Sequence, residues 1–478
     1  MVDFECGPNV RLPSGDACDR VHFVGISGIG MSALARILMA RGIAVSGSSD
    51  RRTALTDALA AEGARIAIGH AAEHCAGATS VVISTAIDEH NPELLAAHES
   101  GIPILHRGAL LAQLMAQRRG IAVAGTHGKT TTTAMLARVL EGGGCDPTVV
   151  VGGECVDTRT NARDGAGVWF LSEADESDRS FLGLDPEIAI VTNIENDHIE
   201  SDADLPELVA AFETFVARVP AIGRLVIGID EPRAAALARI AHAAPTTTFG
   251  FAADADIRAA HPHYADFGST FDVIVRGVTA GTIVLKVPGA INIEDALAAI
   301  AVGLELHIPM AAIATALAEY RGVRRRFEIL TCGDRMTVVD DYAHHPTAVE
   351  ATIAAARANF DGPIVVAFQP HRYTRTRYLG NDFARALRAA DRVVLTDIYA
   401  ASEAPIPGVD ATTIGIPLAA LGCDVAYAKV EDLETELLAH VPHGALVLML
   451  GAGSITAAAA RLARAIESRV ASASTSAP

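Results

Sequence analysis

The sequence predicts an α/β protein of three domains, each built on a largely parallel sheet. Short apolar strands alternate with alanine-rich helical patterns nearly throughout the 478 residues, which is typical of parallel α/β layers. A chain of this length is expected to form about three domains. In three successive blocks, glycine-rich or polar clusters directly follow a strand, where open α/β sheets place their ligands.

The charge, the apolar runs and the cysteines of the chain limit which partners it could bind and in which compartment it could work. The net charge of -19 and the pI near 5.3 argue against a nucleic-acid partner or an anionic membrane surface, because the overall field would repel both. No apolar run reaches membrane-spanning length without charge or glycine, so we expect no membrane insertion. The seven cysteines are scattered and never form C-x-x-C, which predicts reduced thiols and a cytoplasmic location.

The first block opens with the strand VHFVGI and passes through a glycine loop into the helical pattern MSALARILMARG. Gly25, Gly28 and Gly30 give G-x-x-G-x-G, which is offset from the dinucleotide fingerprint G-x-G-x-x-G. Backbone N–H groups at such a loop can bind a diphosphate. Two alternatives stay open at this point: a purely structural turn, and a nicotinamide-dependent oxidoreductase that would use Asp50, about twenty residues further on.

The second block begins with IAVAGTHGKT, a strand followed by a glycine loop and a helix. G-T-H-G-K-T, Gly125 to Thr130, is shorter than the usual phosphate loop G-x-x-x-x-G-K-[ST]. Lys129 is one of only three lysines, since arginine otherwise carries the positive charge. A lysine retained here suggests that a compact ammonium binds phosphate.

Two acidic clusters follow later strands of this block. LSEADESD contains Glu173, Asp175, Glu176 and Asp178, and TNIENDH contains Asn193, Glu195, Asp197 and His198. Such clusters are often solvated turns. Two of them on the same sheet edge as a phosphate loop predict oxygen ligands and an imidazole around Mg²⁺, to which Thr130 would add its hydroxyl.

The third block starts around Arg321 and includes MTVVDDYAHHP, IVVAFQPHRYTRTR, RVVLTD and ALVLMLGAGSI. His344 and His345 precede a proline and could merely begin a helix. The arginines at 372, 375 and 377 could form a solvated face. Their position after a strand, in a chain this acidic, favours anion binding.

Taken in order along nearly the whole chain, the motifs resemble the Mur ligase family. They are HFVGISGIGM, STAI, GTHGKTTT, EADESD, TNIENDH, GVRRRFE, DDYAHHPT, QPHRYTRTR and GAGSI. The resemblance implies a UDP-sugar-binding, Rossmann-like domain over residues 1–107 and a central ATP-binding domain over 108–322. It also implies a mobile, Rossmann-like amino-acid-binding domain over 323–478.

Within the family, the chain is most similar to the member that adds alanine. The resemblance implies ATP-dependent ligation of L-alanine to the lactyl carboxylate of UDP-N-acetylmuramate through an acyl phosphate. The products would be UDP-N-acetylmuramoyl-L-alanine, ADP and phosphate, in peptidoglycan precursor synthesis. The alternatives are the recycling ligase that adds a tripeptide to the same UDP-sugar, the oxidoreductase, and a non-catalytic nucleotide-binding regulator.

The resemblance also implies roles for individual residues. The UDP-sugar would contact Ser27, Gly28, Ile29, Gly30, Met31, His70, Ser84 and Thr85. ATP would contact Gly125, Thr126, His127, Gly128, Lys129, Thr130, Thr131, Asn292 and Arg326. Thr130, Glu173 and His198 would hold Mg²⁺. The catalytic set would be Lys129, Glu173, His198, Arg326, Asp341 and His344, and the amino acid would contact His344, Arg372, Arg375 and Arg377.

The chain departs from the family pattern beside Asn292. Most relatives have histidine and a second asparagine where PGAINIEDA has Ile291 and Asp295, which puts the usual adenine contacts in question. The carbamylated lysine of several other Mur ligases has no counterpart between Glu173 and His198, as in the alanine-adding member.

Overall fold

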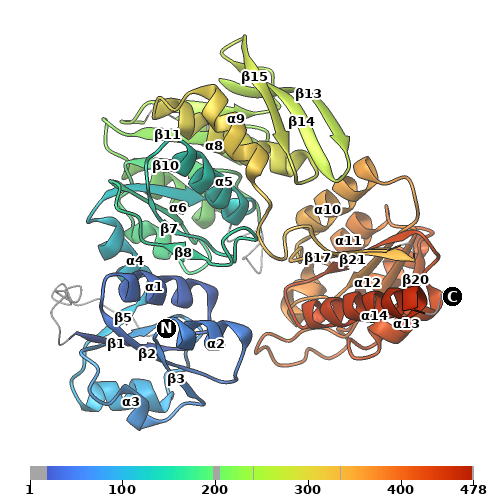
Figure 1. The fold of residues 1–478 in the computed structure, drawn as a ribbon, viewed down its shortest axis with the longest axis horizontal. Coiled ribbons are helices and arrows are strands. Elements are labelled where there is room, and N and C mark those ends of the chain that lie inside the picture. Colours follow the sequence, from blue (N-terminus) through green and yellow to red (C-terminus); the bar gives the residue numbers. More distant parts are fainter. Residues whose placement is uncertain (1–18, 197–204, 241, 334, 476–478) are drawn as a thin grey trace.

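The computed structural model describes residues 19–196, 205–240, 242–333 and 335–475 (Figure 1). In these residues the strands form three sheets that follow one another along the chain. The predicted three-part α/β fold is therefore confirmed. None of the helices in the described part combines the length and apolar character needed to span a membrane.

The first sheet has the strand order β3-β2-β1-β4-β5, and all of its pairings are parallel, as expected for a Rossmann-like domain. Its strands are β1 Arg20–Val24, β2 Ala44–Ser49, β3 Arg65–Ile68, β4 Ser80–Ile83 and β5 Ile104–His106. Its helical segments are α1 Ile29–Ala40, α2 Ala54–Ala61, the 3-10 helix η1 Ala72–Cys75 and α3 Pro92–Glu99.

Helix α4, Arg107–Met115, leads from the first sheet to the second, whose order is β15-β14-β13-β12-β11-β10-β6-β9-β7-β8. The strands are β6 Arg119–Ala124, β7 Thr148–Val150, β8 Ala162–Arg163, β9 Trp169–Glu173, β10 Ile188–Val191, β11 Arg224–Gly228, β12 Thr246–Gly250, β13 Ile257–Ala265, β14 Gly268–Val275 and β15 Val278–Leu285. The helical segments are α5 Lys129–Gly142, η2 Ser180–Gly183, α6 Leu205–Ala217, α7 Pro232–Arg239, α8 Ala290–Glu305 and α9 Met310–Glu319. Strands β13 to β15 pair antiparallel with one another and extend this sheet at one edge.

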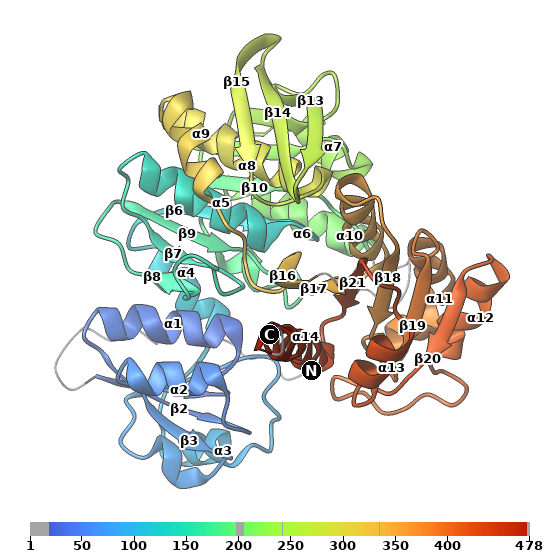
Figure 2. The same cartoon turned by 45° about the vertical axis from the view of Figure 1, so that its right-hand side comes forward.

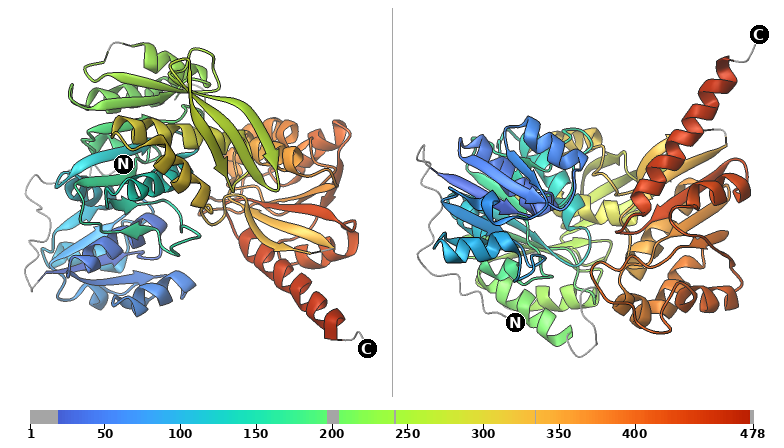
Figure 3. Two further views of the ribbon diagram at one scale, coloured as in Figure 1. Left: turned by 45° about the horizontal axis from the view of Figure 1, so that its top comes forward. Right: turned by 90° about the horizontal axis from the view of Figure 1, so that it is seen from below.

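The third sheet has the order β16-β17-β21-β18-β19-β20, parallel except for the edge strand β16. Its strands are β16 Glu328–Cys332, β17 Met336–Asp341, β18 Ile364–Phe368, β19 Arg392–Leu395, β20 Asp424–Tyr427 and β21 Ala445–Leu450. Its helices are α10 Pro346–Asn359, α11 Tyr373–Leu387, α12 Thr412–Ala420, α13 Leu433–His440 and α14 Ile455–Thr475. The far end of α14 projects beyond the rest of this domain (Figure 3).

The central domain contacts both of the others; in Figure 1 the first domain lies below it and the third to its lower right, and Figure 2 shows the same arrangement from another side. One apolar cluster contains buried residues of both the first and the central domain, among them Phe23 and Phe212. The buried residues of the two clusters in the third sheet come only from Phe327 onward. We propose domain limits of 1–107, 108–322 and 323–478, which fall between successive sheets.

Candidate active site

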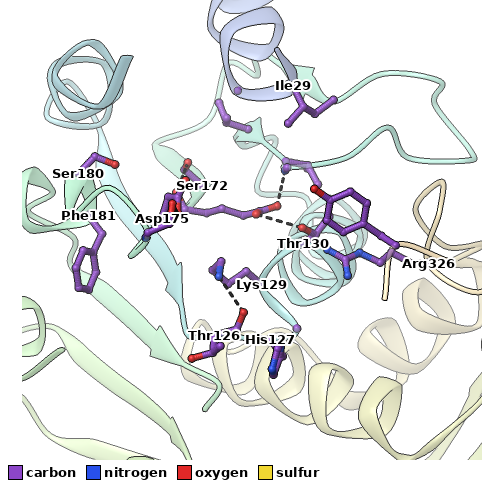
Figure 4. A pocket seen from close by; sticks show the side chains of 18 of the residues that line it. Ile29, Thr126, His127, Lys129, Thr130, Ser172, Asp175, Ser180, Phe181 and Arg326 are labelled. Carbon is purple, nitrogen blue, oxygen red and sulfur yellow. Dashed lines mark hydrogen bonds between the residues drawn. The ribbon is translucent and has the colours of Figure 1, made fainter. Parts of the chain in front are cut away.

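A cavity of about 310 Å³ lies where elements of all three domains meet (Figure 4). The start of α1, the loop between β6 and α5, and the end of β9 contribute to its wall. The C-terminal domain contributes Arg326, Tyr342, His344 and His345. Because polar clusters at the carboxyl ends of parallel strands line it, this cavity is the candidate active site.

The loop between β6 and α5 requires glycine at two positions. Gly125 has φ +134°, and a Cβ there would lie 2.0 Å from Oγ1 of Thr192. Gly128 has φ +83°, and a Cβ there would lie 2.3 Å from Oδ1 of Asp295. Both positions therefore exclude larger residues, and the loop turns tightly into the N-terminus of α5, where an anion is favoured.

The segment after β10 holds this loop in place. The backbone N–H of His127 donates to Oδ1 of Asn193 (2.8 Å), and Oγ1 of Thr192 donates to the His127 carbonyl (2.6 Å). The backbone N–H of Glu195 donates to Oγ1 of Thr126 (2.8 Å). The TNIENDH motif thus has a structural role in positioning the loop, in addition to the metal-binding role expected of His198. His198 itself lies outside the described residues.

Lys129 begins α5, and its ammonium turns back toward the loop (Figure 4). Nζ donates to the carbonyls of Gly125 (2.5 Å) and Thr126 (3.1 Å), and it lies 2.8 Å from Oε2 of Glu176. Burial alone would lower the pKa of Lys129, but Glu176 and the neighbouring carboxylates raise it above its usual value. The loop therefore holds a permanent cation. The sequence indicated the acidic cluster but not that Glu176 would pair with this lysine.

Thr130 and Glu173 meet as expected for two ligands of one metal ion. Oγ1 of Thr130 donates to Oε2 of Glu173 (3.2 Å), and the backbone N–H of Gly152 donates to Oε1. Burial raises the pKa of Glu173 despite the opposing effects of Gly152 and Lys129. A half-buried carboxylate beside a hydroxyl supplies hard oxygen ligands and lacks full charge compensation, so these residues fit Mg²⁺.

Of the residues predicted from the C-terminal domain, Arg326 and His344 line the cavity, and Asp341 supports them. The Arg326 guanidinium lies 5.3 Å from the centre of the Tyr342 ring, and Nδ1 of His344 donates to the Tyr342 carbonyl (2.8 Å). Asp341 does not line the cavity. It accepts backbone N–H bonds from Phe327 (2.6 Å) and Ala343 (2.7 Å), and so fixes the chain on either side of the cavity residues.

The first glycine loop contributes part of the same wall. Ile29 and Gly30 line the cavity, whereas Met31 is buried in the domain core. Ser27 accepts a hydrogen bond from Ser49 (2.8 Å between the Oγ atoms). The rest of the predicted UDP-sugar set, Ser27, Gly28, His70, Ser84 and Thr85, is not part of the cavity wall.

Apart from His344, the predicted amino-acid contacts and the predicted adenine contact are separate from the cavity. Arg372, Arg375 and Arg377 lie at the start of α11 and do not line it. Arg372 and Arg377 are exposed, as expected for the solvated-face alternative. Nδ2 of Asn292 donates to the Pro288 carbonyl (2.6 Å), within its own helix start. The structure therefore brings together only part of the predicted set, including Lys129 and Glu173.

Arg107 is a further site residue, one that the sequence motifs do not indicate. It begins α4 and lines the cavity, and its Nη2 donates to Asp175 (2.7 Å) and Asp178 (2.6 Å) across the boundary between the first two sheets. Burial alone would raise the pKa of Asp175, but Arg107 and Lys129 hold it at about 2. Two of the predicted acidic metal candidates are thus engaged by arginine. The only sequence signal was an arginine directly after the strand in PILHRG.

Family models match almost the whole chain in three consecutive parts. They are "Mur ligase family, catalytic domain" over 20–119, "Mur ligase middle domain" over 123–303 and "Mur ligase, glutamate ligase domain" over 325–453. The chain is 45% identical to a UDP-N-acetylmuramate–L-alanine ligase of Burkholderia cenocepacia over 458 residues, covering 94% of this chain and 98% of that protein.

Two solved structures share the fold. The UDP-N-acetylmuramate-alanine ligase MurC of Thermotoga maritima matches with a TM-score of 0.82 and 31% identity, covering 94% of this chain and 99% of that one. A murein peptide ligase of Psychrobacter arcticus matches with a TM-score of 0.71 and 24% identity, covering 94% and 98%. At that identity the second likeness bears on the fold alone.

Proposed function

Because the chain belongs to the Mur ligase family, we propose that it uses ATP to join L-alanine to the lactyl carboxylate of UDP-N-acetylmuramate. The products are UDP-N-acetylmuramoyl-L-alanine, ADP and phosphate, and the reaction belongs to peptidoglycan precursor synthesis. The supporting relative is the 45% identical ligase that bears this name and is covered almost end to end.

The observation that carries the proposal is the meeting of Lys129, Glu173 and Arg326 in one cavity with the start of α1. ATP activation needs cations around the phosphates, and the acceptor carboxylate must reach the γ-phosphate from the UDP-sugar side. A wall built from both glycine loops meets both needs at once. A nicotinamide oxidoreductase is disfavoured, because Asp50, its candidate ribose ligand, is paired with Nε2 of His70 (2.9 Å).

The residues fit the chemistry of carboxylate activation. A carboxylate is a poor acylating group until it is phosphorylated, and its approach to the γ-phosphate crowds negative charge together. Lys129 and Arg326 are placed to stabilise that charge as it develops. Thr130 and Glu173, with His198 as expected from the family pattern, would hold Mg²⁺, which when bound offsets phosphate charge further.

The amine of L-alanine then attacks the acyl carbon, and phosphate leaves from the tetrahedral intermediate. His344 lines the cavity and is the proposed amino-acid contact nearest the reacting groups. Arg372, Arg375 and Arg377 remain proposed contacts for the α-carboxylate, which domain movement would have to bring to the cavity. Location in the cytoplasm is part of the proposal and is supported by the free thiols of Cys75, Cys145, Cys155, Cys332 and Cys423.

A substrate panel tests the assignment. The purified chain is given UDP-N-acetylmuramate, ATP and Mg²⁺ with either L-alanine or the tripeptide L-Ala-γ-D-Glu-meso-diaminopimelate, and the product is identified by mass spectrometry. We expect efficient ligation of L-alanine and phosphate release that requires both substrates. Efficient product formation only with the tripeptide would overturn the choice of acceptor and leave the reaction class intact.

A further inference from the structure

Three potential metal ligands from two domains meet beside the phosphate loop. His127 belongs to that loop, Glu195 follows β10, and His345 immediately precedes α10 of the C-terminal domain. One ligand atom of each lies within 4.8 Å of the corresponding atoms of the other two. We call these three residues the interdomain histidine cluster. It shares no residue with the proposed Mg²⁺ ligands.

The carboxylate of the cluster is anionic and already oriented. Oε2 of Glu195 accepts a hydrogen bond from Oγ1 of Thr347 (2.6 Å) and lies 3.6 Å from Nε2 of His127. That second distance is too long for a hydrogen bond. Burial alone would raise the pKa of Glu195, but His127 and Thr347 lower it below its usual value.

His345 is held in the tautomer that suits a metal ligand. Its Nε2 lies 3.1 Å from the Asn196 carbonyl, which can only accept, so the proton is on Nε2 and the lone pair of the neutral ring is on Nδ1. A ring N–H donated to a backbone carbonyl is the usual outer support of a metal-bound histidine. The side chain is well buried, with a residue exposure of 7%.

His127 supplies the third ligand from the central domain, facing His345 of the C-terminal domain. Its ring centre lies 5.2 Å from that of His345, and its Nε2 is buried without a hydrogen-bond partner. Its backbone N–H is held by Asn193 (2.8 Å), which fixes the point from which the ring projects. A buried ring nitrogen aimed at a carboxylate, but too far for a hydrogen bond, fits an ion between them.

We propose that His127, Glu195 and His345 bind one divalent first-row transition-metal ion, such as Zn²⁺, and that this ion pins the C-terminal domain to the phosphate loop. Two imidazoles and one carboxylate suit Zn²⁺, Co²⁺ or Ni²⁺, whereas Mg²⁺ prefers oxygen ligands. Ligands around a tetrahedral ion with bonds of about 2.1 Å lie about 3.4 Å apart, so modest side-chain rotation closes the site.

A bound ion would slow turnover by holding the two domains together. Since the ligands join two domains, a bound ion holds the phosphate loop against the start of α10, and any step that separates the domains becomes slower. Excess Zn²⁺ should therefore inhibit the enzyme while raising its Tm. This consequence for turnover rests on the proposed function, but binding of the ion does not.

Co²⁺ titration tests the binding directly, without substrates. The untagged, chelator-treated chain is titrated with Co²⁺ in the absence of Mg²⁺, and visible absorption is recorded. We expect one ion per chain to give the intense bands of a tetrahedral nitrogen and oxygen site, with no thiolate charge-transfer band. Any Co²⁺ at the proposed Mg²⁺ site would add only the weaker bands of higher coordination. His345→Gln and Glu195→Gln should each weaken binding by at least about tenfold, with the fold checked by circular dichroism.

Two matched variants locate the ion. His344→Gln changes the neighbouring histidine, whose Nδ1 is directed to the Tyr342 carbonyl, and it should keep the wild-type Co²⁺ affinity. Glu173→Gln alters the proposed Mg²⁺ site and should leave the tetrahedral Co²⁺ bands unchanged. Unchanged binding in folded His345→Gln, loss of those bands in Glu173→Gln, or no binding by the wild type would each overturn the proposal. A failed alanine ligation assay would concern only the proposed function.

Discussion

The two glycine loops occupy equivalent places in the fold but differ in backbone conformation before the helix and in the charges around them. Each joins a parallel strand to a helix, β1 to α1 and β6 to α5, and each opens with a glycine of positive φ, Gly25 (+76°) and Gly125 (+134°). Gly28, at the start of α1, has an ordinary φ of -63°, whereas Gly128, at the start of α5, has φ +83°. Both helix starts line the same cavity.

The difference in charge indicates which loop only binds an anion and which one also takes part in the chemistry. The first loop offers backbone N–H groups and neutral side chains such as Ser27 and Ile29. The second adds the cation of Lys129, the Thr130 hydroxyl and the half-buried carboxylate of Glu173. Under the proposed function, both loops are suited to bind anions, and the charged side chains around the second loop suit it to phosphoryl chemistry.

The largest effect is expected from removing the cation of the second loop. Lys129→Ala should lower kcat/KM for ligation by at least about 10²–10³-fold, because it removes a donor aimed at developing charge. UDP-sugar binding, measured by calorimetry, should be preserved because the first loop is untouched. Equal loss of both properties in a folded protein would contradict the division between the loops.

Two control variants distinguish a loss of catalysis in Lys129→Ala from a loss of stability. Lys129→Ala leaves the carboxylate of Glu176 without its ammonium partner in a buried position, which is destabilising. The double variant Lys129→Ala with Glu176→Gln removes that charge and should remain inactive. Lys286→Ala changes an exposed lysine and should retain activity.

A smaller loss is expected at the carboxylate. Glu173→Gln should lower turnover by about tenfold to a hundredfold and shift the Mg²⁺ titration to higher concentration, because it removes a charged oxygen ligand. Glu213→Gln, on the exposed side of α6, is the matched control. An unchanged Mg²⁺ titration in Glu173→Gln would remove this residue from the proposed metal site.

The same substitution in the two loops should have unequal effects. Gly128→Ala forces a Cβ to 2.3 Å from Asp295 at a positive φ, so we expect a loss of about 1–3 kcal/mol in the free energy of unfolding and weaker ATP binding. Gly28→Ala meets only ordinary contacts at 3.5 Å, so its stability should change by no more than about 0.5 kcal/mol. Denaturant unfolding compares them, and equal losses would contradict the geometric distinction.

Local pattern was enough to predict the fold and the second loop. Strand, glycine loop and helix are adjacent in sequence, so the sequence alone places G-T-H-G-K-T between a strand and a helix. The pairing of Lys129 with Glu176 and of Arg107 with Asp175 could not, because it depends on how separate strand ends and domains meet. The interdomain position of His345 likewise depends on the packing of α10, which no local spacing encodes.

Asp295 has the smallest expected effect in the comparison of the two glycine loops. It is also the most specific test, because it places a further carboxyl group against the second loop only. It is buried in α8, accepts a hydrogen bond from Oγ1 of Thr132 (2.9 Å) and packs against Gly128. Burial raises the pKa of its carboxyl from 3.8 to about 7, with Thr132 and Arg326 opposing the shift. An asparagine could accept the same hydrogen bond without carrying charge.

Above about pH 7 the Asp295 carboxyl becomes an anion beside the phosphate-binding loop, so the KM for ATP should rise severalfold between pH 6 and pH 8. Asp295→Asn should lower that KM at pH 8 and flatten its pH dependence.

The protonation of Asp295 also makes stability depend on pH. The folded state binds this proton more tightly than the unfolded state, so the stability that the bound proton contributes is lost as pH rises from about 4 through about 7. The Tm advantage of Asp295→Asn should therefore be larger at pH 8 than at pH 5. Asp254→Asn, at an exposed aspartate, is the control, and a KM profile that Asp295→Asn leaves unchanged would show that the carboxyl does not act on the nucleotide.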